Sequence, residues 1–79
     1  MNNSVIYVVT KVEEEGSFSQ IFDNRDLALA EYYSSIGSFI EKYGSAFSEQ
    51  NPSSESIYKK SCKWVGKAAE IVMSLGIIK

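Results

Sequence analysis

The segment that most constrains the fold of this chain is residues 57–76, IYKKSCKWVGKAAEIVMSLG, which carries the only Trp and the only Cys. On a helical wheel at about 100° per residue, its lysines and most other polar side chains gather within an arc of roughly 100°. Its apolar side chains fill an arc of roughly 200°, about twice the width that a helix lying on a core requires. We therefore predict a long amphipathic helix over residues 52–75 that is covered on two sides.

The start of the chain predicts a β-hairpin over residues 5–22. The stretch VIYVVTKV is β-branched or aromatic at nearly every position, which is typical of a strand. Three glutamates and Gly16 follow and would form the turn, because glycine accepts a positive φ without strain. The next residues, SFSQIF, alternate and are expected to pair back as a second strand.

A first helix is expected over residues 24–43, with Asp23 as its N-cap and Gly44 as its C-terminal stop. Residues 45–51 are mostly polar and are expected to form a loop before the second helix. Together these elements predict a single α+β domain over residues 1–79. Its fold would be a two-stranded antiparallel hairpin packed on two antiparallel helices (ββαα).

The small size of the chain implies that its core needs support. A chain of 79 residues buries only about 60% of the surface that it exposes when unfolded. One Cys excludes an internal disulfide, and without His a zinc or iron site would consist of carboxylates alone, which suits neither metal. We therefore predict no metal and no cofactor, and we expect the support to come from a homodimer or from docking on a partner.

The net charge of −2 hides a strong asymmetry along the chain. Residues 1–56 hold three basic and nine acidic side chains, whereas residues 57–79 hold five basic and one acidic. This bipolar pattern favours pairing of the two halves, within one chain or between copies. Direct nucleic-acid binding is possible but not favoured, because general nucleic-acid binders are normally basic overall.

Four lysines of the second half are candidates for a phosphate site or for contact with an acidic partner. Spacing of four residues stacks ammonium groups on one face of a helix, where they could bind such ligands. The alternative is a solvated helix face, since polar faces of small helical proteins are commonly rich in lysine. The candidates are Lys59, Lys60, Lys63 and Lys67.

Three glutamates at the hairpin turn, Glu13, Glu14 and Glu15, are candidates for binding a partner protein. They would form an acidic prong that mimics nucleic-acid phosphates or enters a groove rich in Arg and Lys. The alternative is a soluble turn whose charges discourage aggregation through the strand edge.

The aromatic residues offer a second kind of anchor. Those at helical spacing in the first helix, such as Tyr32, are expected to lie in the core. Tyr7, Tyr58 and Trp64 lie at the borders of apolar faces and are candidate anchors, because aromatic residues are enriched in binding hot spots.

Catalysis has little support in the sequence. There is no His, and no Ser or Cys has a recognisable base partner. Cys62 falls within the apolar arc and is expected to be an inert, buried thiol. We predict no catalytic residues and no enzymatic activity.

The chain also carries no signal for a membrane or for export. No run approaches the about 18 apolar residues of a membrane span. The start, MNNSVIYVV, has no basic lead, so we expect no secretion signal and no membrane partner. An unpaired Cys fits a reducing cytoplasm, where we expect this chain to act.

The opening pattern IYVVTKV…G…IFDNRDLALAEYY resembles the start of many small uncharacterised proteins of bacteriophages and mobile elements. These proteins often begin with a short strand, a glycine-bearing turn, a second strand of IF type and a helix with Ala and Tyr. The resemblance covers about residues 5–33 and assigns no residue a role. The resemblance implies an inhibitor of host machinery in the cytoplasm of a bacterial host cell, because small phage proteins of this kind include anti-CRISPR and other anti-defence proteins.

Three functions remain open on these grounds. The first is a non-enzymatic inhibitor that occupies a protein surface of a bacterial nucleic-acid-handling or defence complex. The second is a self-associating module that binds nucleotide or nucleic acid through the lysine row. The third is a structural subunit that only pairs with copies of itself.

Overall fold

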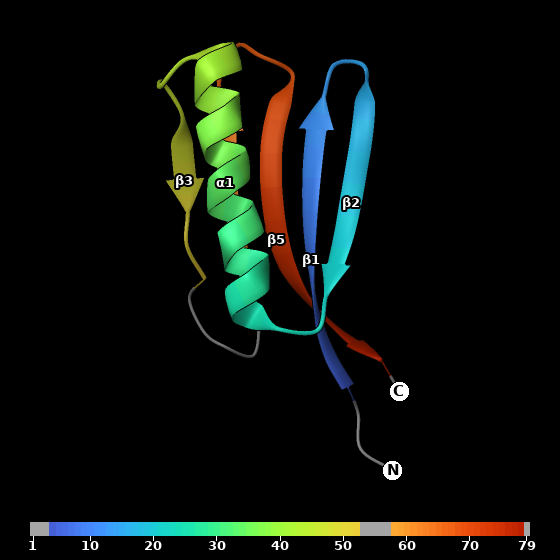
Figure 1. Cartoon of the computed structure of the whole chain (residues 1–79). Helices are drawn as coiled ribbons and strands as arrows, with labels where there is room; N and C mark the ends of the chain where they lie inside the picture. Colours follow the sequence, from blue (N-terminus) through green and yellow to red (C-terminus); the bar gives the residue numbers. More distant parts are fainter. Residues whose placement is uncertain (1–3, 53–57, 79) are drawn as a thin grey trace.

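The computed structural model describes residues 4–52 and 58–78, which form one antiparallel β-sheet and one α-helix (Figure 1). A hairpin comes first, the helix follows it, and three further strands complete the sheet. The elements are β1 (Ser4–Glu13), β2 (Gly16–Phe22), α1 (Arg25–Tyr43), β3 (Ser48–Gln50), β4 (Lys59–Trp64) and β5 (Ala69–Ile78).

The five strands lie in the order β2-β1-β5-β4-β3, and every neighbouring pair is antiparallel. β1 and β5, with 10 residues each, pair along most of their length at the centre of the sheet. The register of this pair aligns Val9 with Met73. β2 and β3 form the two edges, so the sheet joins the two ends of the chain at its centre.

The predicted ββαα architecture is wrong in its second half. Residues 59–64 and 69–78 are strands, so the protein is a five-stranded sheet with a single helix. Residues 65–68 between them form a turn, in which Gly66 has a φ of 81°. Glycine adopts this left-handed conformation without the clash that a Cβ would cause. Residues 53–57, also part of the predicted helix, lie outside the described residues.

Strands can carry the same spacing that predicted a helix in the second half of the chain. Residues four apart share a face on a helix and also on a strand, so the spacing of Lys59 and Lys63 fits both structures. Along β5 the side chains alternate, with Ile71 and Met73 buried and Val72 on the opposite face. Pairing with β1 stabilises β5. A helical wheel considers only neighbouring residues, so it could not reveal this contact between distant parts of the chain.

The predicted hairpin and first helix are both present. β1 and β2 pair from Tyr7 opposite Phe22 to Glu13 opposite Gly16. The helix ends at Gly44 as predicted, where the Gly44 N–H donates to the backbone carbonyl of Ile40 over 2.9 Å. Within the described residues, no helix combines the length and the apolar character needed to cross a membrane.

The start of the helix differs from the prediction by one residue. Asn24, rather than Asp23, is the N-cap of α1. Its Oδ1 accepts hydrogen bonds from the backbone N–H of Asp26 at 2.8 Å and of Leu27 at 3.2 Å. Asn and Asp are equally good caps, so the residue type alone does not choose between the two positions.

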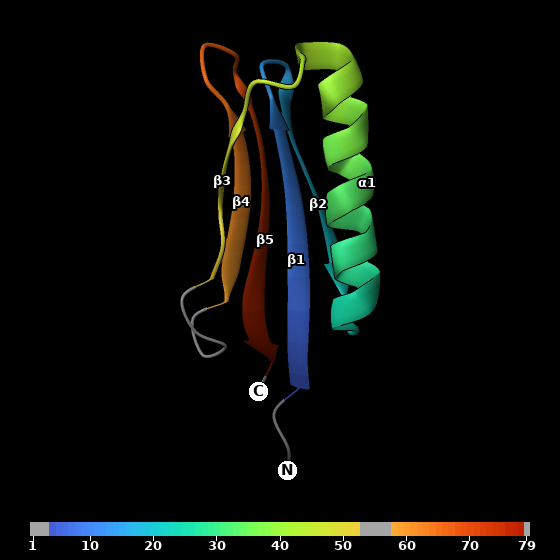
Figure 2. The ribbon, with the colours of Figure 1, turned by 90° about the vertical axis from the view of Figure 1, so that its left-hand side faces the viewer.

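Helix α1 covers one face of the sheet, and the core lies between the two layers (Figure 2). The buried side chains of α1 are Ala28, Tyr32, Ser35, Ile36 and Phe39. The core residues are Val9, Ala28, Tyr32, Ile36, Phe39, Cys62, Trp64, Ala69, Ile71 and Met73.

The other face of the sheet is covered by no helix or strand of the described residues, and we call it the open face (Figure 2). Alternation along each strand assigns its side chains. They are Ile6, Val8, Thr10 and Val12 of β1; Ser17, Ser19 and Ile21 of β2; Ser48 and Gln50 of β3; Lys59, Ser61 and Lys63 of β4; and Glu70, Val72 and Ser74 of β5.

The region 45–51, predicted as a loop, includes the short edge strand β3.

Candidate partner-binding site

The three glutamates of the hairpin tip have different environments. Glu13 ends β1, and its Oε1 accepts hydrogen bonds from Lys42 Nζ at 3.0 Å and from the Tyr43 hydroxyl at 2.9 Å. These bonds, first that from Lys42 and then that from Tyr43, lower the pKa of Glu13 below its ordinary value. Glu13 therefore ties the hairpin to the C-terminal turn of α1, whereas Glu14 and Glu15 are exposed.

The pKa values of the two partners of Glu13 are raised, opposite to that of Glu13 itself. The hydrogen bond to the Glu13 carboxylate raises the pKa of Lys42, so the lysine remains charged. Partial burial and the same carboxylate raise the pKa of Tyr43, so its hydroxyl remains a donor. This contact also places a positive charge near the carbonyl end of the helix, which the helix dipole favours.

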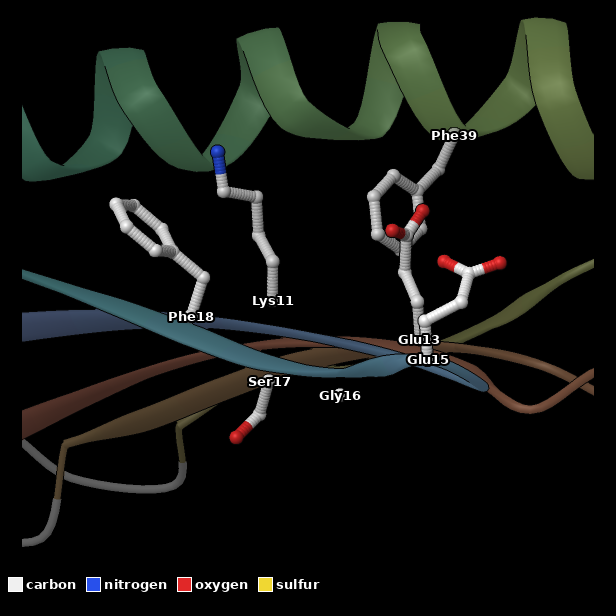
Figure 3. A pocket seen from close by; sticks show the side chains of 7 residues that line it. All are labelled: Lys11, Glu13, Glu15, Gly16, Ser17, Phe18 and Phe39. Carbon is white, nitrogen blue, oxygen red and sulfur yellow. The ribbon is translucent and has the colours of Figure 1, made fainter.

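A pocket of about 420 Å³ opens between the hairpin and α1 (Figure 3). Glu13 and Glu15 stand together on the side of the sheet that faces the helix, and Lys11 and Phe18 stand further along the same side. The pocket is lined by Lys11, Glu13, Glu15, Gly16, Ser17, Phe18 and Phe39, and we call it the hairpin pocket.

The two ends of the hairpin pocket differ in charge. Lys11 Nζ lies 3.2 Å from Glu31 Oε2 and 5.5 Å from the centre of the Phe18 ring, so its charge is already balanced. Glu15 forms no ion pair within the described part of the chain. The carboxylate end is therefore the end where a cation from a partner can bind.

The outer edge of β2 borders this pocket and pairs with no other strand of the described residues. β2 has seven residues, GSFSQIF, without a charged side chain or a proline. Natural proteins commonly protect exposed edge strands with such residues, since unpaired backbone groups attract other strands. Phe18 is 59% exposed and Ile21 67% exposed, so β2 also carries apolar side chains on both faces. An edge with these properties can accept a strand from a partner.

The four candidate lysines do not form a row. Lys59 and Lys63 lie on the open face of β4, and Lys67 lies in the turn that follows. Lys60 points to the helix side and is 8% exposed. The predicted helical face that would gather their charges is absent.

Lys60 instead belongs to a polar cluster at the β3 edge. Its Nζ donates to Asn51 Oδ1, lies 3.6 Å from Glu49 Oε2, and lies 5.7 Å from the centre of the Tyr32 ring. Burial lowers the pKa of Lys60, but the Tyr33 hydroxyl and the Glu49 carboxylate raise it by more, so the group remains charged. The cluster attaches β3 to the rest of the sheet.

The same carboxylate affects two buried neighbours. Tyr32 donates a hydrogen bond to Glu49 Oε2 over 3.2 Å, and burial together with that negative charge raises its pKa. Burial and Glu49 also raise the pKa of the Cys62 thiol to about 11. Cys62 is fully buried, so the prediction of an inert thiol agrees with its environment.

The predicted aromatic anchors are packed inside the protein to different degrees. Trp64 is fully buried, and its Nε1–H donates to the Gly44 carbonyl over 2.7 Å. Tyr7 and Tyr58 are half-buried and form an edge-on contact with their ring centres 6.0 Å apart. The exposed aromatic residue beside the pocket is Phe18, which the sequence reasoning missed. The available sequence signal was its place in the alternating stretch SFSQIF, whereas the position of that strand at the edge of the sheet follows only from the fold.

Other functional signals are sparse. No group of three or more residues able to hold a metal ion occurs in residues 4–52 and 58–78. Comparisons of the chain with protein-family models, with curated proteins and with solved structures found no match. The assignment of function therefore rests on the geometry of the site.

Proposed function

We propose that this chain is a non-enzymatic inhibitor of phage type that binds a protein component of a bacterial nucleic-acid-handling or defence complex. The observation that carries the proposal is the free edge of β2 beside the hairpin pocket. This surface joins a backbone edge that can pair with a strand, the exposed Phe18 ring and the carboxylate of Glu15, which forms no ion pair with any described residue. These are features of peptide and strand recognition.

Pairing with β2 would give the partner's strand its affinity and register. Its backbone groups would bond to the outer edge of β2, as in other cases of strand addition. Alternate side chains of the added strand would then lie beside Phe18, on the side that faces the helix. A long side chain there would contact the exposed ring and reach Glu15.

The charge of the pocket selects the partner. An Arg or Lys of the partner would place its apolar stem against Phe18 and its charge near Glu15. Exposed basic segments are common on proteins that handle nucleic acids, because such proteins contact phosphates. This charge preference supports a target of that kind over an acidic one.

The open face gives little support to direct binding of single-stranded nucleic acid. Sheet proteins of that kind stack bases on aromatic side chains. None of the side chains assigned above to the open face is aromatic. The aromatic residues of the strands, among them Phe18, Phe22 and Trp64, lie on the side that faces the helix.

The test uses bacterial strains that each carry one defined defence system and are infected with a phage that the system restricts. Expression of the chain is expected to raise the plating efficiency of the phage on at least one strain. Phe18→Ala is expected to weaken binding to that target about thirtyfold, because removal of a hot-spot residue costs about 2 kcal/mol. Since Phe18 is largely exposed, this variant should fold normally.

A charge reversal with a matched control separates the pocket from the overall charge. Glu15→Lys is expected to abolish the effect on plating, and Glu41→Lys, on the exposed side of α1, is expected to retain it. Equal loss in both variants would assign the effect to net charge and contradict the role of the pocket. Unchanged plating with the wild-type chain on every strain would contradict the proposed function itself.

A further inference from the structure

The open face has an apolar centre that is unusual for a sheet face in water. Antiparallel sheets with one solvated face normally alternate apolar and polar residues. On β1, however, Ile6, Val8 and Val12 lie on the open face while Val9 is buried beneath α1. Val72 of the neighbouring strand extends this apolar centre.

The charged groups of the open face lie on β4 and on its neighbour β5. Lys59 and Lys63 lie on β4, and Glu70 lies opposite Lys63 on β5. The other flank, β2, has only uncharged side chains on this face, including Ser17 and Ser19. The face is therefore basic on one side, apolar in the middle and rich in hydroxyl groups on the other side.

The size of the face matches what a small dimer needs. With about 3.3 Å per residue and about 4.8 Å between strands, strands of these lengths span roughly 600 Å². Two such faces in contact would bury roughly 1,200 Å² in total, which is the lower limit for stable specific interfaces.

Charge then selects how two copies can pack. A two-fold axis across the strands would place β4 over β4 and bring the lysines of both copies together. A two-fold axis parallel to the strands, between β1 and β5, places β4 of each copy over β2 of the other. The second arrangement packs the two apolar centres together and sets each pair of lysines over an uncharged strand.

We propose that two copies of this chain form a dimer by packing their open faces together around a two-fold axis parallel to the strands. The inference goes beyond the proposed function and does not depend on it. The sheets would lie about 10 Å apart, as in a β-sandwich. The two hairpin pockets would face outward on opposite sides, and the β2 edges would remain free.

The strand register specifies which residues meet across the dimer. Ser17, Val12, Glu70 and Lys63 are aligned across the sheet, so Ser17 of one copy lies over the partner's Lys63. Substitutions at Ser17 therefore test the arrangement by charge. Ser17 is exposed, so a charged residue there does not disturb the core.

The experiment measures the molar mass by light scattering during size-exclusion chromatography, over a range of protein concentrations. The wild-type chain is expected to reach twice the chain mass. Ser17→Glu would place a carboxylate over the partner's Lys63 at two symmetric positions, so we expect the affinity of the dimer to rise about tenfold. Ser17→Lys would place two ammonium groups over each other at the same positions, so we expect the affinity to fall about tenfold. The same two substitutions at Ser34, on the exposed side of α1, should leave the affinity unchanged.

Each other outcome would overturn the proposal. A monomer at every concentration would leave the open face to a partner of another sequence. A dimer that weakens equally with Ser17→Glu and Ser17→Lys would exclude the proposed axis. A dimer that ignores both substitutions but dissociates with Phe18→Ala would place the contact at the β2 edge.

Discussion

Glu13 shows how one residue type can have separate roles at adjacent positions. The sequence presents three equivalent glutamates, and only the fold brings Lys42 and Tyr43 to the first of them. Lys42 and Tyr43 lie 29 and 30 residues after Glu13 in the chain. Sequence reasoning could identify the acidic turn, but it could not separate an anchoring carboxylate from a free one.

This contact predicts a pH-dependent stability. The folded state lowers the pKa of Glu13 from its ordinary value of 4.5, so the stabilisation is present above that value. It is lost as the pH falls through the lower folded-state pKa. Glu13→Gln is therefore expected to lower the midpoint of thermal unfolding at neutral pH, with the difference vanishing in acid.

The measurement is thermal unfolding followed by circular dichroism over a series of pH values. Glu14→Gln serves as the control, because Glu14 is exposed at the turn and its side chain forms no hydrogen bond or ion pair within residues 4–52 and 58–78. A constant difference between Glu13→Gln and the wild type at all pH values would exclude the ionised carboxylate as the cause.

At the scale of elements, local patterns predicted the hairpin and α1 well. Their signals lie within a few residues of each other: strand composition, a glycine turn and a glycine helix end. β4 and β5 were missed because their stability comes from pairing with β1 and each other. The candidate site was predicted in part, since Glu15 was proposed and Phe18 was not.

The N-cap of α1 offers a direct test at this scale. Asn24→Ala removes the acceptor of two backbone N–H groups and is expected to lower the free energy of unfolding by about 1 kcal/mol. Asp23→Ala is expected to cost much less, although both residues precede the helix. Urea unfolding of the two variants measures the difference, and the reverse order would place the start of the helix at the predicted residue.

At the scale of the whole molecule, the apolar side chains of the second half of the chain belong to both faces of the sheet, the face packed on α1 and the open face. The apolar side chains of residues 58–76 divide between the core and the exterior: Ile71 and Met73 are buried, whereas Val65 is 77% exposed. The side chains that were predicted to form two apolar sides of a helix instead point to the two faces of the sheet. One face is covered by α1, and we propose that a second copy covers the other.

The five-stranded sheet and the dimer proposed for its open face require that the second half of the chain forms strands. Nuclear magnetic resonance of the backbone tests this claim most directly. The structure predicts extended chemical shifts for β4 and β5, with cross-strand proton contacts between Cys62 and Ile71 and between Val9 and Met73. Helical shifts and continuous sequential amide contacts over residues 57–76 would contradict the five-stranded sheet and its open face.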